Sequence, residues 1–327
     1  MPVPELLMPD IVETTAPGKV VLWGEYAVLA GVPAAVMAVD RFATCRITSH
    51  KSGFRLHATG FEMKPVDTPD LRETSLPTSA RLFAAAASAL ISTPRENLNI
   101  VLDTSTFQGA TGKLGIGSSA AALVACYGAL AAWSGEEVDL ARAIAAHRHF
   151  QGSGSGLDVA AAIHGGTIRF KSERAQPLEL PLSLHIRFVF SGESASTAKK
   201  LGSFSSWRER GNTVPLDMLA LACHALFEHA DDPDAWRRYV DALRHLDLSA
   251  NLGIFSTAHN VLSELADGHG LLYKPCGAGG GDVGMVIGFD HDGSHHHIGA
   301  FESAAQQRGF VPLDLTGTAH GLERRIG

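Results

Sequence analysis

Two kinds of hydrophobic pattern share the first half of the chain. Short apolar runs at residues 20–23 and 98–103 predict strands, and alternating residues at 43–48 predict a further strand. An alanine-rich stretch at 79–90 predicts a helix. The longest apolar block, 120–133, is too short to span a bilayer and therefore predicts a buried helix.

The second half of the chain has a mainly helical pattern. Apolar residues recur there at three- and four-residue intervals with polar residues between them, which is typical of amphipathic helices. Such helices are predicted at 216–228, 235–248 and 255–266. A strand at 284–289, a helix at 300–308 and a strand at 310–315 are predicted to close the chain.

Composition narrows the class of protein. A chain of 327 residues has room for about two domains, and 45% hydrophobic and 19% charged residues are typical of a soluble globular protein. The formal net charge of −7 argues against nucleic acid or an acidic membrane as a partner. Four cysteines without metal-site spacing suit reduced thiols, and the N-terminus lacks the pattern of a signal peptide. We therefore expect a cytoplasmic protein.

The segment KLGIGSSAAAL, residues 113–123, has the pattern of an anion-binding loop. Gly115 and Gly117 can adopt positive φ, and Ser118 and Ser119 stand at the start of the apolar helix. The first N–H groups of a helix have no partner within it, so they favour an anion, and Lys113 adds a full positive charge. The pattern matches neither a P-loop nor a GxGxxG dinucleotide loop. A glycine turn without a ligand is the alternative interpretation.

Two charged residues next to apolar segments are candidates for chemistry. Lys19 follows a predicted Pro17-Gly18 turn and precedes a strand of buried type, where an ammonium group is costly without an anion. Asp158 ends a glycine- and serine-rich turn immediately before an apolar helix. A lysine that extends to solvent and an aspartate that caps the helix are the alternatives.

The histidines give weaker signals. His147 and His149 lie near the end of a helix predicted at 138–150, where the helix dipole favours a structural role for each ring. The run His295, His296 and His297 lies inside the chain and is interpreted neither as a tag nor as a metal site. A Ser/Thr-rich turn near 192–197 could bind a second anion through its hydroxyl and N–H groups.

Three segments in order resemble the motifs of the GHMP small-molecule kinases. They are APGKVVLWGEYAVL at 16–29, KLGIGSSAA at 113–121 and KPCGAGGGD at 274–282. QGSGSGLDVAAAIHGG at 151–166 and GESAST at 192–197 are also similar to segments of this family. The matches span most of the chain.

The resemblance implies an α+β protein of two domains with the active site between them. Residues 1–180 would form an N-terminal domain like ribosomal protein S5, and residues 181–327 a ferredoxin-like C-terminal domain with a glycine-rich loop. ATP and Mg²⁺ would be the cofactors. The residues implied to hold ATP are Lys113, Gly115, Ile116, Gly117, Ser118, Ser119 and Ala120. Ser119 would also reach Mg²⁺, whose carboxylate ligand the sequence does not identify.

By the same resemblance, Lys19 and Asp158 would act on the reacting groups. The residues implied to bind the acceptor are Glu25, Tyr26, Ser153, Ser155, Ser196, Thr197, Gly279, Gly280 and Asp282. The partners expected are ATP and a small anionic substrate, with no nucleic acid and no membrane, in a monomer or homodimer.

The implied activity is ATP-dependent phosphoryl transfer to a small acid of the mevalonate pathway. If the acceptor already carries a phosphate, charge screening by Lys19 should matter more than a base, whereas a hydroxyl acceptor would need Asp158 as the base. A kinase for mevalonate, a kinase for another small hydroxy acid or sugar, a decarboxylase of the same fold and a catalytically silent relative are the alternatives.

Overall fold

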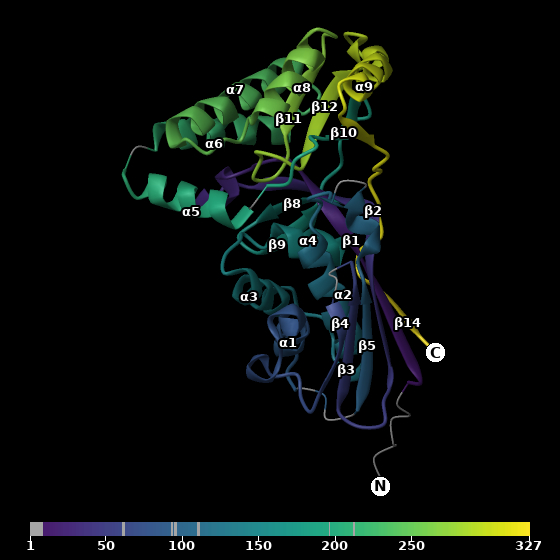
Figure 1. The fold of residues 1–327 in the computed structure, drawn as a ribbon. Coiled ribbons are helices and arrows are strands. Elements are labelled where there is room, and N and C mark those ends of the chain that lie inside the picture. The colour runs from purple at the N-terminus through teal and green to yellow at the C-terminus, as the bar shows by residue number, and fades with distance from the viewer. Residues whose placement is uncertain are drawn as a thin grey trace.

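The computed structural model describes residues 9–60, 63–92, 94, 97–109, 112–195, 197–211 and 213–327. Two β-sheets organise these residues, and helices pack against both (Figure 1). The larger sheet has the strand order β14-β1-β2-β5-β3-β4, with β8 paired to β2 and β9 to β8. The smaller sheet has the order β11-β12-β10-β13. The fold is therefore a mixed α+β fold with two sheets, as the sequence predicts.

The strands of the larger sheet are β1 (Ile11–Trp23), β2 (Ala34–Ser49), β3 (Phe54–Thr59), β4 (Met63–Thr68), β5 (Leu98–Asp103), β8 (Thr167–Lys171), β9 (Arg174–Pro177) and β14 (Glu323–Ile326). The smaller sheet contains β10 (Leu184–Phe190), β11 (Leu272–Pro275), β12 (Val283–Phe289) and β13 (Val311–Leu313). A short ribbon pairs β6 (Gln108–Gly109) with β7 (Gly112–Lys113).

The α-helices are α1 (Arg81–Ser88), α2 (Ser118–Trp133), α3 (Leu140–Gln151), α4 (Leu157–His164), α5 (Thr197–Arg208), α6 (Val214–Glu228), α7 (Pro233–Ala250), α8 (Thr257–Asp267) and α9 (Ile298–Gln307). The helices predicted from the apolar periodicity are thus present, with ends that shift by a few residues. No helix among the described residues is both long enough and apolar enough to cross a membrane.

Helix α2 lies at the centre of the N-terminal part. Its residues from Ala120 to Ala131 are buried, and it packs against β1, β2, α1 and α4. Because it is covered on every side, its sequence has no polar face, which explains the unbroken apolar block. This burial fixes the start of α2, and with it the glycine loop, against the sheet.

The Pro17-Gly18 turn predicted before Lys19 is wrong. Both residues lie inside β1, which continues through them, and the pairing with β2 shifts register between Pro17 and Gly18. A β-bulge of this kind accommodates a proline, because the residue at the irregularity does not have to donate to the ladder. Because the bulge lets β1 continue through Pro17 and Gly18, Lys19 lies within the strand.

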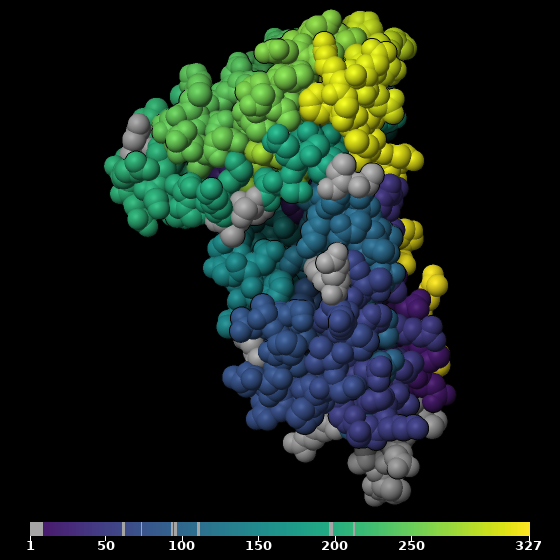
Figure 2. Space-filling model, in the orientation of Figure 1, coloured from purple at the N-terminus to yellow at the C-terminus, as the bar shows by residue number. Residues whose placement is uncertain are grey.

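The smaller sheet is covered on both faces. Val189, Tyr273 and Val286 pack with α8 and α9 in a separate small core, whereas Phe188 and Met285 belong to the main core on the other face. The strand β12 is buried along its whole length for this reason. The C-terminal part projects to one side of the N-terminal part, with a hollow beneath it (Figure 2).

The chain finally returns to its beginning. After β13 it runs back along the N-terminal part, and β14 pairs antiparallel with β1 (Figure 1). The predicted division into residues 1–180 and 181–327 stays a prediction, and β14 shows that the last residues add a strand to the first sheet.

Candidate active site

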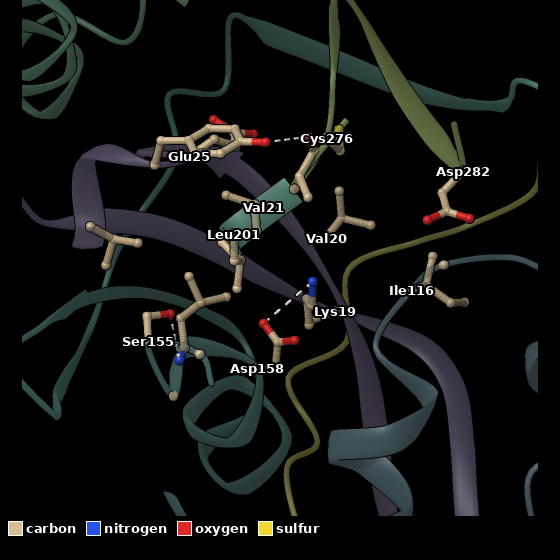
Figure 3. A pocket seen from close by; sticks show the side chains of 18 of the residues that line it. Lys19, Val20, Val21, Glu25, Ile116, Ser155, Asp158, Leu201, Cys276 and Asp282 are labelled. Atoms are coloured by element: carbon tan, nitrogen blue, oxygen red, sulfur yellow. Dashed lines mark hydrogen bonds and ion pairs between the residues drawn. The ribbon is translucent and has the colours of Figure 1, made fainter. Parts of the chain in front are cut away.

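A pocket lies where the two sheets approach each other (Figure 3). One wall is formed by β1 and the following turn, and the floor by α3, α4 and the loop between them. The glycine loop before α2 and the segment 276–283 close the other sides. Elements from both ends of the chain therefore contribute to one site.

The glycine loop before α2 has the geometry of an anion site. Gly115 has φ 73° and Gly117 has φ 84°, values that glycine adopts without strain. Gly117 is the N-cap of α2, and no side chain caps this helix start. The first N–H groups of a 16-residue helix are thus directed toward the loop without a capping side chain. Ser118 and Ser119 are the first two helical residues, so α2 begins two residues before the helix predicted at 120–133.

Asp282 joins the segment 276–283 to this loop. A Cβ atom at Gly115 would overlap the carboxylate group of Asp282, so the two residues fit together only because Gly115 has no side chain. The backbone N–H of Asp282 donates to the carbonyl of Glu193 at 2.6 Å. Burial raises the pKa of Asp282, while the N–H of Ala195 and the charge of Lys19 oppose this shift.

Lys19 and Asp158 form an ion pair inside the pocket (Figure 3). The Nζ of Lys19 lies 3.3 Å from Oδ1 of Asp158, with the two side chains 12% and 31% exposed. The backbone N–H of Lys19 donates to the carbonyl of Ile116 at 2.8 Å, which ties β1 to the glycine loop. A Cβ at Gly117 would lie 3.1 Å from the Lys19 side chain. The ammonium group is therefore paired with an anion, as its buried position requires.

The loop before α4 determines where Asp158 points. Gly156, with φ 93°, is the N-cap of α4, so Asp158 lies in the first turn and does not cap the helix. Arg148 fastens this loop because its guanidinium donates to the carbonyls of Gly154 at 2.9 Å and Ser155 at 2.8 Å. Arg148 also pairs with Glu173. Nothing in the local sequence indicates this role of Arg148.

His147 is a pocket residue that the sequence analysis missed. It is buried on α3, and its Nε2 lies 3.4 Å from the hydroxyl oxygen of Ser119. Burial lowers the pKa of His147, and the nearby Asp158 opposes that change. The signal in the sequence was only a histidine near the end of a helix, a position that also suits a structural ring.

Glu25 reaches the pocket but uses its carboxylate elsewhere. Oε1 of Glu25 accepts a hydrogen bond from Nζ of Lys274 at 2.5 Å, and the two side chains are 1% and 0% exposed. Its other oxygen accepts from the hydroxyl of Tyr239, which itself accepts from the N–H of Gly24 at 2.7 Å. This buried cluster joins β1, α7 and β11, so Glu25 holds the two sheets together beside the pocket.

Other residues predicted to bind the acceptor lie at varying distances from the pocket. Tyr26 and Ser155 line it, and the hydroxyl of Tyr26 donates to the carbonyl of Ala278 at 2.7 Å. Ser153 is exposed and does not contribute to the lining. Thr197 begins α5, and Ser196 lies outside the described residues.

The glycines of the segment 276–283 serve mainly as packing positions. A Cβ at Gly279 would clash with Ile254, and one at Gly280 would clash with the end of Lys200. Lys200 in turn donates to the carbonyls of Leu252 at 2.7 Å and Gly253 at 2.9 Å. The segment is thus held against the end of α7 and presents Asp282 to the glycine loop.

The remaining predicted ATP residues surround the helix start. Ile116 lines the pocket, and Ala120 is buried in α2. Lys113 is exposed on β7 and does not contribute to the pocket lining. A charge at this edge of the loop is exposed to solvent.

Comparison with known proteins identifies the class. Residues 81–166 match the family described as the GHMP kinases N terminal domain, and this range contains the glycine loop and Asp158. The match shows that this part of the chain is similar to the N-terminal domain of the GHMP kinases, and the relatives below, which are similar over most of the chain, are kinases of small molecules. The expected two-domain α+β fold of that family is confirmed.

Within this class the chain is similar to enzymes of one pathway. The phosphomevalonate kinase of Streptomyces sp. (strain CL190) is 28% identical, over 94% of this chain and 97% of the relative. The mevalonate kinase of Archaeoglobus fulgidus is 28% identical, over 84% and 90%. The structure of Streptococcus pneumoniae phosphomevalonate kinase in complex with phosphomevalonate and AMPPNP has a TM-score of 0.74 at 17% identity, over 93% and 99%. This last likeness establishes the fold.

Proposed function

We propose that the protein transfers the γ-phosphoryl group of ATP to phosphomevalonate, giving diphosphomevalonate and ADP. The Lys19–Asp158 ion pair beside the uncapped start of α2 is the observation that carries this proposal. In the reaction, the bond from the γ-phosphorus to the oxygen bridging to the β-phosphate breaks. A new bond forms from that phosphorus to an oxygen of the acceptor phosphate. The likeness to phosphomevalonate kinase over nearly the full length supports the choice of acceptor.

Lys19 would bring the two anions together. An acceptor phosphate has a second pKa of about 6, so its oxygen is already ionised near neutral pH and needs no strong base. The obstacle is repulsion between donor and acceptor. At an effective dielectric constant near 20, unit charges about 4 Å apart interact by roughly 4 kcal/mol, which is the scale of the screening that Lys19 can supply.

Asp158 would orient Lys19 for this task. Its Oδ1 lies within ion-pair distance of the ammonium group, and the clamp by Arg148 holds its loop. For a phosphate acceptor the carboxylate is a positioning group. For a hydroxyl acceptor the same carboxylate would accept the proton during transfer.

The residues at the glycine loop fit ATP and Mg²⁺. The free N–H groups at the start of α2 suit phosphate oxygens, and the absence of side chains at Gly115 and Gly117 leaves the backbone accessible. Mg²⁺ prefers oxygen ligands and keeps several waters, so the hydroxyl of Ser119 and the carboxylate of Asp158, which both neighbour His147, suit it. When bound, the ion would neutralise charge on the transferring phosphoryl group.

One observation favours mevalonate as a second candidate acceptor. Among the described residues that line the pocket, Lys19 is the single lysine or arginine. An acceptor with one carboxylate needs less positive charge than one that also carries a phosphate. The apolar wall formed by Val20, Val28 and Leu201 suits the short branched carbon chain of either acid.

A panel assay tests the proposal. The enzyme is supplied with ATP and Mg²⁺ and, in separate reactions, with mevalonate, phosphomevalonate or diphosphomevalonate, while ADP and CO₂ are measured. We expect ADP release with phosphomevalonate, a new diphosphate resonance in ³¹P NMR and no CO₂. Faster turnover of mevalonate would establish the second candidate instead, and release of CO₂ would identify a decarboxylase.

A further inference from the structure

A second cluster of polar side chains lies at the opposite end of β12 from Asp282. It contains His185 on β10, Asp290 just after β12, and His295 in the 3₁₀ helix η5 (Ser294–His297). One ligand atom from each of these residues lies within 4.8 Å of the others. Because a strand rises by roughly 3.3 Å per residue, Asp290 lies roughly 25 Å from Asp282. The cluster is therefore remote from the candidate active site.

Strand register brings the three side chains to one face of the sheet. His185 pairs with Gly288, and directly opposite residues in an antiparallel pair share a face. Asp290 follows Gly288 by two positions and continues the ladder through its N–H, which donates to the carbonyl of Ser183 at 3.0 Å. Gly288 leaves room for η5, because a Cβ there would lie 2.8 Å from the Cα of His295. The missing side chain thus lets His295 lie beside His185.

The two imidazole rings share one carboxylate oxygen. Nε2 of His185 lies 2.6 Å from Oδ1 of Asp290, and Nδ1 of His295 lies 3.4 Å from the same atom. The rings are stacked, with centroids 4.7 Å apart. In the metal-free protein, Nδ1 of His295 also donates to the backbone carbonyl of Phe289 at 3.0 Å, a hydrogen bond that metal binding would replace. Two imidazole nitrogens and one carboxylate oxygen therefore converge.

We propose that His185, Asp290 and His295 bind a divalent metal ion of the zinc class. Imidazole nitrogens suit Zn²⁺, Ni²⁺ and Co²⁺, whereas Mg²⁺ is held by oxygen ligands. The site is thus chemically distinct from any magnesium site beside Ser119. The histidine run 295–297 does not have the spacing of a metal site in the sequence. Only His295 of this run belongs to the cluster, and its partner His185 lies far away along the chain.

One of the separations already suits such an ion, and a second needs a small adjustment. In a tetrahedral zinc site with bonds of about 2.0 to 2.2 Å, neighbouring ligand atoms are about 3.3 to 3.5 Å apart. The separation of Asp290 and His295 has this value, and His185 must move away from Asp290 by about 0.7 Å. The side chains of His185 and Asp290 are 36% and 52% exposed, so this adjustment meets little packing resistance.

Metal binding would cross-link three elements of the C-terminal part. The ion would join β10, the end of β12 and η5, and η5 leads directly into α9 (Figure 1). An ion that binds the folded state but not the unfolded chain raises stability in proportion to the logarithm of its concentration above Kd. The site is therefore structural, and zinc should raise the melting temperature.

The test uses the full chain without a histidine tag, after treatment with EDTA. Zinc chloride is titrated by calorimetry, and melting is followed with and without zinc. Cobalt chloride serves as a second probe, because its visible spectrum reports coordination by nitrogen ligands. We expect a site with a stoichiometry of one, and a loss of affinity of at least about tenfold in His185→Ala and in Asp290→Asn.

His320→Ala is the matched control. His320 is exposed and pairs with the carboxylate of Glu323. It is therefore a histidine–carboxylate pair like that of His185 and Asp290, but without a second imidazole in the contact. Its removal should leave the titration unchanged. Circular dichroism of the metal-free variants tests whether they are folded. If His185→Ala does not fold, Asp290→Asn still tests the site, because asparagine keeps the shape of the aspartate side chain. Absence of zinc binding, or binding that neither variant in the cluster weakens, would overturn the proposal.

Discussion

The carboxylate of Asp282 occupies the space that a side chain at Gly115 would need. The two residues come from the N-terminal and C-terminal parts of the chain, and their contact joins the segment 276–283 to the loop before α2. The glycine thus allows both the positive φ of the loop and the close approach of the second sheet.

Gly115→Ala should therefore reduce activity by at least about tenfold, chiefly through a higher KM for ATP, because both the loop and Asp282 must move. The control is Gly112→Ala. Gly112 also has positive φ, 126°, but a Cβ there meets open space. Steady-state kinetics at varied ATP would compare them. Adding Asp282→Gly to Gly115→Ala should restore part of the ATP affinity, and equal damage in the two single alanine variants would contradict the packing argument.

Lys19 and Asp158 should differ in their effect on turnover. With phosphomevalonate as acceptor, Lys19→Met should lower kcat by about three orders of magnitude, because the charge that screens the two phosphates is lost. Asp158→Asn should lower kcat by about ten- to a hundredfold, since it loses orientation and not the base. Rapid-quench measurement of product formation would compare them. Greater damage from Asp158→Asn would indicate a hydroxyl acceptor.

The buried pair of Glu25 and Lys274 should control stability more than chemistry. Lys274→Met leaves a carboxylate without its cation in a fully buried position, which typically costs about 3 to 5 kcal/mol. Glu25→Gln in the same chain removes that charge and should recover part of the loss. Urea denaturation of both single variants and the double variant gives the coupling energy. Additive losses would show that the two side chains do not act as a pair.

His259 should make the protein less stable in mild acid. Its Nε2 donates to the carbonyl of Gly281 at 2.9 Å and its Nδ1 accepts from the hydroxyl of Tyr273 at 2.7 Å. Burial lowers the pKa of His259 to about 4. The unfolded chain, with a pKa near 6.5, therefore takes up a proton before the folded protein does.

The contribution of His259 to stability is complete above pH 6.5 and is lost as the pH falls toward 4, by about 3 kcal/mol in all. Free energies of unfolding measured between pH 7.5 and 4.5 would record this slope. His259→Gln should flatten the profile. An unchanged slope in His259→Gln would exclude this origin.

The parts of the site that could be predicted from sequence have local signatures. Asp158 and Gly115 each stand in or next to a glycine-rich segment beside an apolar run, and Lys19 follows Gly18 and precedes an apolar run, so the local sequence indicates all three. His147 and Arg148 have no such mark. Their roles depend on contacts with Ser119 and with the carbonyls of residues 154 and 155, which only the packing of α3 against α2 and α4 creates.

The same limit applies to the fold. Helix α2 could be predicted because a helix buried on every side has an unbroken apolar sequence. The course of β1 through Pro17 and Gly18 could not, since the bulge exists only in the pairing with β2. Nor could Glu25 be distinguished from a ligand-binding acid, because its partner Lys274 lies at the far end of the chain.

The return of β14 to β1 attaches the C-terminal part to the larger sheet by two tethers, one on each side of residues 184–313. The second tether is itself fastened, because Thr318 exchanges backbone hydrogen bonds with Ala38 and Gly166, and Arg41 donates to the carbonyl of Asp314. The buried pair of Glu25 and Lys274 is a third link between the two parts, so the three connections together hold Asp282 opposite Gly115.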